Sequence, residues 1–245
     1  MLVIINGSTG EIGNALVSVF SESDLSIIGL GRNEEKLLKL ESEHPNFVGF
    51  RISSVTSQNE IDNLKLFLDK KFRGDWPISG YIHAVADFKR FGDPLEIPID
   101  EWRNSIDINL TGTYIWNQAI LRIMKNNSSG SLVNIVSQAW KTGGFSPIGP
   151  YAASKGGIVT MSSNFARLLG KYGVRVNCVS PGYVDSSMMN SGLDKATQEK
   201  LAMQVPLERF AKPKEIANAC KFLISPESSY INGTVIDVSG GLTYP

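Results

Sequence analysis

The chain has 245 residues, of which 42% are hydrophobic and 20% charged, a composition typical of a globular protein with a sizeable core. Lys and Arg together number 24, as do Asp and Glu, so the net charge gives no reason to expect binding to nucleic acid or to an anionic membrane. The two cysteines lie in apolar runs and no Cys/His cluster exists, which argues against a disulfide and predicts no metal site.

The apolar runs are short. None approaches the length of a membrane-spanning helix. Residues 2–5 are too few for the core of a signal peptide and lack a basic leader. We therefore expect a cytoplasmic protein with no membrane contact.

Apolar segments alternate with amphipathic ones along the whole chain. In chain order we expect a strand at 2–5, a glycine-rich turn at 6–13 leading into a helix, a strand at 25–30, a helix at 34–43, a strand at 47–52 and a helix at 57–72. A turn at 74–77, a strand at 78–85, a loop at 86–98 and a long helix at 99–125 follow. The remaining elements are a strand at 132–136, a loop at 137–149, a helix at 150–172, a strand at 174–179, a loop at 180–212 with a short helix at 196–203, a helix at 213–224 and a strand at 234–238.

This alternation of strands and helices predicts parallel βαβ units. Right-handed crossovers then give a doubly wound, seven-stranded parallel sheet with helices on both faces, a Rossmann-like α/β fold. Because no repeat or linker interrupts the pattern, we expect one dinucleotide-binding domain over residues 1–245, with a substrate loop at about 183–212.

The turn after the first strand has three glycines, in the pattern Gly7-x-x-Gly10-x-x-Gly13. Glycines permit a tight turn and close approach to a pyrophosphate, and the helix N-terminus offers free N–H groups to the phosphates. The alternative is that these glycines serve only packing. The strand-turn-helix context favours a dinucleotide site.

Gly31 and Arg32 directly follow the second strand, where dinucleotide folds face the adenosine ribose. An acidic residue there binds the 2′-hydroxyl of NAD, whereas an arginine accommodates the 2′-phosphate of NADP. The nearest acids, Glu34 and Glu35, come only in the next helix. The sequence thus favours NADP over NAD, although Arg32 is also compatible with a solvated strand end.

Tyr151 and Lys155 lie one turn apart on the same face of a predicted helix. A nearby ammonium lowers the pKa of a phenol and makes it usable as a general acid/base. Ser137 ends the fifth strand at the edge of the sheet where ligands bind, and could bond a substrate carbonyl. The alternatives are a surface lysine whose stem covers Tyr151, and a turn or N-cap role for Ser137.

Six segments occur in an order that resembles the short-chain dehydrogenase/reductase family over nearly the full chain. They are the glycine turn, Asn109-Leu-Thr-Gly112, Ser137, Tyr151-x-x-x-Lys155, Ser180-Pro-Gly182 and Val238-Ser-Gly-Gly241. The tail, from Val205-Pro-Leu207 to Ile231-Asn-Gly233, is similar to the 3-oxoacyl-carrier-protein reductase branch.

The resemblance implies four catalytic residues. Ser137 bonds the substrate oxygen, and Tyr151 exchanges a proton with it as hydride moves to or from the nicotinamide. Lys155 holds the nicotinamide ribose and biases Tyr151 towards phenolate. Asn109 holds a water that connects Lys155 to solvent, through a local distortion of the long helix.

The resemblance also implies the cofactor contacts and the assembly. Family members are usually homo-oligomers, tetramers or dimers, that pair the two long helices and the C-terminal strands. The residues expected to contact the cofactor are Gly7, Ser8, Thr9, Gly10, Ile12, Gly13, Arg32, Ser54, Val55, Ala84, Tyr151, Lys155, Pro181, Gly182, Val184 and Ser186.

Three positions depart from the family pattern. Glu11 stands where glycine is commoner, so that the glycine spacing matches members that act on nucleotide sugars, and its carboxylate repels the pyrophosphate unless it turns outward. His83 replaces an asparagine after the fourth strand, and we expect it to bond backbone with one ring nitrogen. Ser54 replaces an aspartate that contacts adenine, so adenine recognition should be looser.

Two loops of the family line the substrate. Here they carry aromatic and methionine side chains, which fit an apolar or ring-shaped substrate. The candidate pocket residues are Gln138, Trp140, Phe145, Tyr183 and Met188.

The sequence therefore predicts an NADP-dependent oxidoreductase that interconverts a small-molecule carbonyl and an alcohol, with Tyr151 as general acid/base. Two alternatives stay open. One is a non-catalytic dinucleotide-sensing protein on the same fold, although such proteins typically lose the Tyr/Lys pair. The other is a sugar epimerase or dehydratase, which only the glycine spacing favours.

Overall fold

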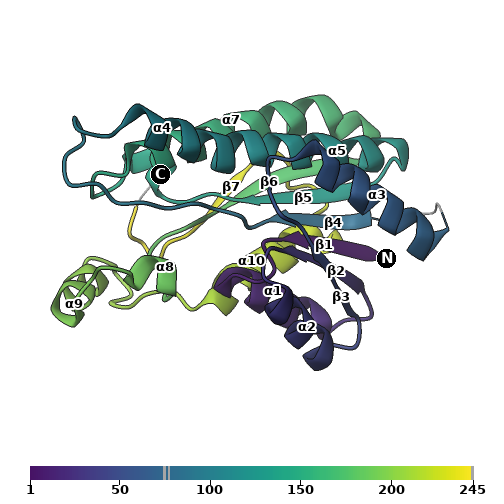
Figure 1. The fold of residues 1–245 in the computed structure, drawn as a ribbon, viewed down its shortest axis with the longest axis horizontal. Helices are drawn as coiled ribbons and strands as arrows, with labels where there is room; N and C mark the ends of the chain where they lie inside the picture. The colour runs from purple at the N-terminus through teal and green to yellow at the C-terminus, as the bar shows by residue number, and fades with distance from the viewer. Residues whose placement is uncertain (74–75, 77, 244–245) are drawn as a thin grey trace.

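The computed structural model describes residues 1–73, 76 and 78–243, so the turn expected at 74–77 lies, apart from Trp76, outside the described residues. Seven parallel strands form one sheet in the order β3-β2-β1-β4-β5-β6-β7 (Figure 1). This confirms the predicted doubly wound fold. The strands are β1 (Leu2–Asn6), β2 (Ser26–Gly31), β3 (Phe47–Arg51), β4 (Ile78–His83), β5 (Gly130–Ile135), β6 (Val174–Pro181) and β7 (Val235–Val238).

The strand order reverses between β1 and β4. At such a switch point the loops after neighbouring strands turn to opposite faces of the sheet and leave a crevice at the carboxyl ends of the strands. The glycine turn follows β1 and the loop from residue 84 follows β4, so both border this crevice.

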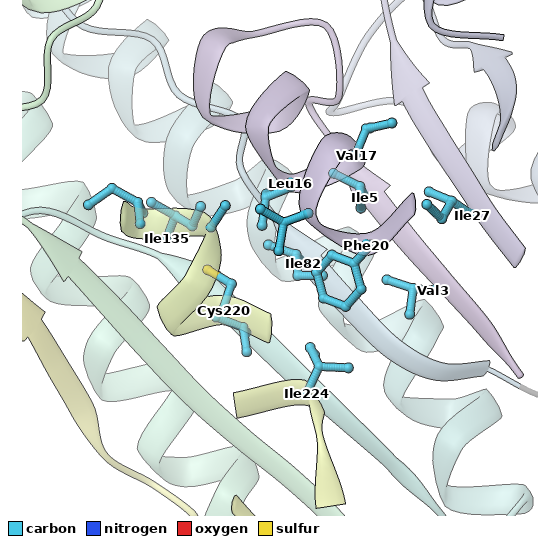
Figure 2. Packing of buried hydrophobic residues seen from close by; sticks show 14 of the residues in the cluster. Val3, Ile5, Leu16, Val17, Phe20, Ile27, Ile82, Ile135, Cys220 and Ile224 are labelled. Carbon is cyan, nitrogen blue, oxygen red and sulfur yellow. The ribbon is translucent and has the colours of Figure 1, made fainter. Parts of the chain in front are cut away.

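Helices cover both faces of the sheet because the strands are apolar on both sides. Along β1, Val3 and Ile5 face α1 (Glu11–Ser21), α2 (Glu34–Glu43) and α10 (Pro213–Ile224), and Figure 2 shows them packed with Leu16 and Phe20. The alternate residues of β1 join the second cluster, under α3 (Gln58–Phe72), α5 (Gly112–Asn126) and α7 (Gly149–Leu169), where Trp116 is fully buried. Figure 1 shows these two helical layers on opposite sides of the sheet.

The long helix expected at 99–125 is divided into three parts. A π-helical turn, η1 (Asp107–Thr111), separates α4 (Ile99–Ile106) from α5. This confirms the distortion that the family resemblance implied around Asn109. π-Helical turns inside α-helices recur at functional sites.

The loops at the carboxyl edge contain more helix than the sequence predicted. α6 (Ala139–Thr142) lies in the expected loop at 137–149, and α8 (Ser187–Asn190) precedes α9 (Lys195–Met203) in the loop at 180–212. In Figure 1, α8 and α9 project beyond the end of the sheet. The short 3₁₀ segments are η2 (Gly170–Tyr172) and η3 (Pro226–Ser228). No helix in the described part of the chain is both long and apolar enough to cross a membrane.

Candidate active site

A cavity of about 420 Å³ opens at the carboxyl ends of β4, β5 and β6. Its lining comes from the start of α1, the loops after these three strands, α7, and the segment from α8 to α9. The sequence pattern brings these segments together because parallel strands end at the same edge of the sheet. Of the four residues predicted to be catalytic, Ser137, Tyr151 and Lys155 line the cavity.

The glycine turn has two glycines that its own packing requires. Gly7 has φ +89°, and a Cβ on it would lie 2.9 Å from the backbone of Ala84. A Cβ on Gly13 would lie 2.0 Å from the carbonyl oxygen of Gly7. Gly10 is different, because its Cβ would meet only that same oxygen, at 3.5 Å, and Gly10 lines the cavity. Packing thus explains Gly7 and Gly13 but leaves space beside Gly10, at the N-terminus of α1, which fits the pyrophosphate of a dinucleotide.

Glu11, the first residue of α1, directs its carboxylate to the start of α8. Its two carboxylate oxygens each accept a hydrogen bond from the backbone N–H of Ser187, at 2.9 Å, and Oε2 also accepts one from the Ser187 hydroxyl, at 3.3 Å. The glycine turn is thereby tied to the start of α8. Ser186, the residue before, caps α8 by accepting a hydrogen bond from the Met189 amide, at 3.2 Å.

Lys155 is buried in α7, and its ammonium donates a hydrogen bond to the carbonyl oxygen of Ile135 at the end of β5, at 3.1 Å. Its nitrogen lies 5.4 Å from the centre of the Tyr151 ring. Burial lowers the pKa of Lys155 to about 8. The predicted one-turn spacing therefore does bring the two side chains together, and the surface-lysine alternative is wrong.

The pKa of Tyr151 departs from the prediction. Burial raises it to about 12, and a hydrogen bond with the Ser137 side chain opposes that change. The expected lowering does not occur here because the desolvation of the phenolate dominates. The ring of Tyr151 packs against Phe88 in a T-shaped arrangement, with centroids 5.0 Å apart.

Ser137 combines the two roles considered for it. Its hydroxyl oxygen accepts a hydrogen bond from the amide of Ala139, at 3.2 Å, which stabilises the turn into α6. The same side chain bonds Tyr151 and lines the cavity.

Asn109 is fully buried in η1, but it does not line the cavity. Its Oδ1 accepts a hydrogen bond from the Asp87 amide at 2.7 Å, and its Nδ2 donates to the Asp87 carbonyl at 2.8 Å and to the Ser105 hydroxyl at 3.2 Å. Its side chain thus fixes the loop after β4 to the π-helical turn. Within the described residues, no hydrogen bond joins it directly to Lys155 or Tyr151.

The predicted cofactor residues fall into two groups. Ten of them line the cavity, namely Gly10, Ile12, Gly13, Ala84, Tyr151, Lys155, Pro181, Gly182, Val184 and Ser186. The other six do not line it, namely Gly7, Ser8 and Thr9 of the glycine turn, and Arg32, Ser54 and Val55.

The six predicted residues that do not line the cavity differ in burial and in their hydrogen bonds. The space beside Gly31 is filled by Thr9, since a Cβ on Gly31 would lie 2.5 Å from the Thr9 methyl carbon. Arg32 is exposed. The Ser54 hydroxyl bonds Thr56 within its own loop, at 2.9 Å.

The predicted substrate residues are partly confirmed as cavity residues. Phe145, Tyr183 and Met188 line the cavity, as does Gln138. The amide of Gln138 is bonded within the protein, to the carbonyl of Ser180 at 3.3 Å and to the Thr243 hydroxyl, so this residue anchors the C-terminal segment. Trp140 does not line the cavity; the prediction for it is wrong, because α6 turns it into a buried cluster with Val136, Ile158 and Cys178.

His83 bonds a side chain rather than backbone. Its Nδ1 lies 2.8 Å from the Tyr81 hydroxyl, and its Nε2 is buried without a partner. Burial lowers the pKa of His83 to about 3, and the charge of Lys155 acts in the same direction. His83 is therefore neutral.

Sequence reasoning missed several residues on the loop after β4. Phe88 and Arg90 line the cavity, and the Arg90 guanidinium lies over the Phe88 ring, 4.9 Å from its centroid. The available signal was the position of this loop at the switch point of the sheet. Other cavity residues that were not predicted include Thr142 and Ile148.

Comparisons with known proteins agree with this architecture. Residues 7–243 match a family described as enoyl-(acyl carrier protein) reductase. The chain is 30% identical to the 3-oxoacyl-[acyl-carrier-protein] reductase of Thermotoga maritima, over 98% of this chain and 96% of that protein. It is 27% identical to glucose 1-dehydrogenase 2 of Bacillus subtilis, over 99% of this chain and 95% of that protein.

The fold is also similar to that of a short chain dehydrogenase from Bacillus anthracis, with a TM-score of 0.88 and 26% identity over 100% of this chain and 98% of that one. The family match and the relatives cover almost the whole chain. The chain therefore belongs to the short-chain dehydrogenase/reductase family and is an NAD(P)-dependent oxidoreductase that interconverts a carbonyl and an alcohol.

Proposed function

We propose that this protein uses NADP to reduce a small-molecule carbonyl, or to oxidise the corresponding alcohol, with Tyr151 as the general acid/base. The observation that carries the proposal is the arrangement of Tyr151, Ser137 and Lys155 around one cavity, with the Lys155 nitrogen 5.4 Å from the Tyr151 ring. When bound, the nicotinamide supplies or accepts the hydride.

In the reduction, the Ser137 hydroxyl donates a hydrogen bond to the substrate oxygen and the Tyr151 hydroxyl gives that oxygen a proton. In the oxidation, the Tyr151 phenolate takes the proton back. The raised pKa of Tyr151 keeps the phenol protonated, which suits the reduction. Lys155 stabilises the phenolate as it forms, and Asn109 maintains the π-helical turn and the adjacent loop.

The residues present fit a dinucleotide. The space beside Gly10 and the N-terminus of α1 receive the pyrophosphate, and Ala84, Pro181, Gly182, Val184 and Ser186 hold the inner end. Thr9, Arg32, Ser54 and Val55 surround the adenosine end. The exposed Arg32 favours the 2′-phosphate of NADP, because no carboxylate directly follows β2 to bind a free 2′-hydroxyl.

We also propose that residues 1–245 are one domain whose loop at about 183–212 covers the substrate, and that it works in the cytoplasm as a homo-oligomer. Exposed apolar side chains on α4, α5, α7 and α10 support pairing of copies through these helices. They include Trp102, Tyr114, Leu168 and Phe222.

The test is a titration of the purified protein with NADPH and with NADH, followed by a panel of carbonyl substrates monitored through NADPH absorbance. We expect tighter binding of NADPH and net oxidation of NADPH by at least one carbonyl. Binding without turnover across the panel would favour a dinucleotide sensor. Isomerisation of a sugar nucleotide with no net change in NADPH would favour an epimerase.

A further inference from the structure

Arg90 binds the loop at about 183–212, here called the covering loop, at the edge of the cavity. Its Nη1 donates a hydrogen bond to the carbonyl oxygen of Ser191, at 2.8 Å, and its Nη2 donates to that of Met189, at 3.0 Å. The same guanidinium lies over the ring of Phe88 and lines the cavity. Arg90 therefore lies between the segment that carries α8 and the interior of the site.

The charge of Arg90 has no acidic partner among the described residues, since none of their ion pairs includes it. The neighbouring Lys89, in contrast, is paired with Glu101. Glu11 also lines the cavity, but its carboxylate is bound to Ser187. Burial lowers the pKa of Arg90, although an arginine stays protonated at neutral pH. The half-exposed guanidinium at the edge of the cavity is thus free of an acidic partner among the residues described and available to an anionic ligand.

A second polar side chain near Arg90 also has a group without a partner. The hydroxyl of Tyr183 is buried without a hydrogen-bond partner, and Tyr183 lines the cavity. Arg90 is close enough to oppose the rise that burial causes in the pKa of Tyr183. The phenol of Tyr183 therefore lies near the guanidinium of Arg90, and its hydroxyl is a further donor that the described residues do not use.

The Arg90 guanidinium and the Tyr151 ring both contact the ring of Phe88. The guanidinium lies 4.9 Å from the Phe88 centroid, which in turn lies 5.0 Å from the Tyr151 centroid. A small molecule can therefore present a carbonyl to Tyr151 and an anionic group to Arg90 at the same time. Arginine has five N–H donors, and the two carbonyls of the covering loop occupy only part of this set.

We propose that Arg90 and Tyr183 bind a carboxylate of the substrate, so that the enzyme acts on short oxo acids or the corresponding hydroxy acids with an apolar body. Arginine matches a carboxylate with paired, charge-assisted hydrogen bonds. Phe88, Ile148, Met189 and Leu193, which also line the cavity, accommodate the apolar body. This inference rests on the proposed function and specifies its substrate class.

The experiment compares oxo acids with their methyl esters in NADPH oxidation, using phenylpyruvate and a 4-oxo-4-phenylbutanoate as the acids. The wild-type enzyme should prefer each turned-over acid over its ester at least tenfold in kcat/KM. Arg90→Met should lose about a hundredfold on the acid and at least about tenfold less than that on the ester, because the lost bonds to the loop affect both substrates and the lost charge affects only the acid. Tyr183→Phe should lose about tenfold on the acid alone. Lys89→Met is the matched control, because it removes a charge from the adjacent position, and it should leave both substrates unaffected.

Two outcomes would overturn the inference. An equal loss on acid and ester in Arg90→Met would assign Arg90 only to holding the covering loop. Equal use of acid and ester by the wild-type enzyme would show that no carboxylate site exists. If neither compound is turned over, calorimetric titration of the NADPH-bound enzyme with phenylpyruvate tests the site. Binding that Arg90→Met abolishes would support the carboxylate site. Absence of binding to the wild-type enzyme would reject it. Turnover of neutral carbonyls without acid preference would refute the carboxylate site while leaving the proposed function intact.

Discussion

The carboxylate of Glu11 binds the backbone N–H of Ser187 through both oxygens, each at 2.9 Å, although 176 residues separate the two. Glu11 is the first residue of α1, which follows the glycine turn, and Ser187 is the first residue of α8 in the covering loop. The bond therefore couples the glycine turn to the loop, and it directs the negative charge of Glu11 towards α8.

Two replacements of Glu11 test its negative charge and its attachment to α8 separately. In Glu11→Gln the charge near the pyrophosphate is removed, and we expect NADPH to bind about three- to tenfold more tightly because electrostatic repulsion falls. In Glu11→Ala the attachment to α8 is lost as well, and residues 187–203 should become more sensitive to limited proteolysis. Fluorescence titration and proteolysis measure the two properties. Glu22→Gln, at the other end of α1, is the control, and weaker NADPH binding in Glu11→Gln would refute the explanation.

Gly10 and Gly13 should respond differently to the same added methyl group. Gly10→Ala meets only an oxygen at 3.5 Å, so the free energy of unfolding should change by less than about 1 kcal/mol while NADPH affinity falls about tenfold or more. Gly13→Ala places a Cβ 2.0 Å from the Gly7 oxygen and should destabilise the fold by about 2 kcal/mol or more. Thermal unfolding and NADPH titration of both variants check this. Unchanged NADPH affinity in Gly10→Ala would show that the pyrophosphate does not bind beside Gly10.

Arg32 should determine the preference between the two nicotinamide cofactors. Arg32→Ser removes the charge that faces a 2′-phosphate, so KM for NADPH should rise about tenfold or more while KM for NADH stays within about twofold. Lys39→Ser, an exposed lysine of α2, is a control for the loss of surface charge. Steady-state kinetics with both cofactors measures the effect. An equal change with NADPH and NADH in Arg32→Ser would contradict the role.

Because Lys155 is buried, the free energy of unfolding should depend on pH in a specific way. Its pKa is about 8 in the folded protein, below the ordinary lysine value of 10.5 that holds in the unfolded chain, so the unfolded state binds more protons between these pH values. The free energy of unfolding contributed by this group therefore rises with pH over that window, by about 3 kcal/mol in total, and is constant below pH 8. Urea unfolding of the cofactor-free wild type and Lys155→Met should diverge in this direction from pH 8 to pH 10. A constant difference would show that the ammonium is not desolvated.

The sequence predicted the fold well because the strands, the helices and the glycine turn are each determined by residues that are close together in the chain. The spacing of Tyr151 and Lys155 predicted their contact, since a helix brings residues four apart onto one face. The pKa of Tyr151 was not predictable in this way, because it depends on how deeply tertiary packing buries the ring. Trp140 was assigned to the substrate pocket, but in the unexpected helix α6 it is partly buried and packs against Val136, Ile158 and Cys178. The bonds of Glu11 to Ser187 and of Arg90 to Met189 and Ser191 join distant segments, and no sequence period encodes such contacts.

The central claim is that Tyr151 transfers the proton, and Tyr151→Phe tests it most directly. The phenyl ring keeps the packing against Phe88 and removes only the hydroxyl. Turnover of the best carbonyl found for the wild type, measured together with NADPH binding, should fall about a thousandfold or more while the NADPH dissociation constant stays within about threefold. Retention of more than about a tenth of the wild-type turnover with NADPH bound would contradict the account.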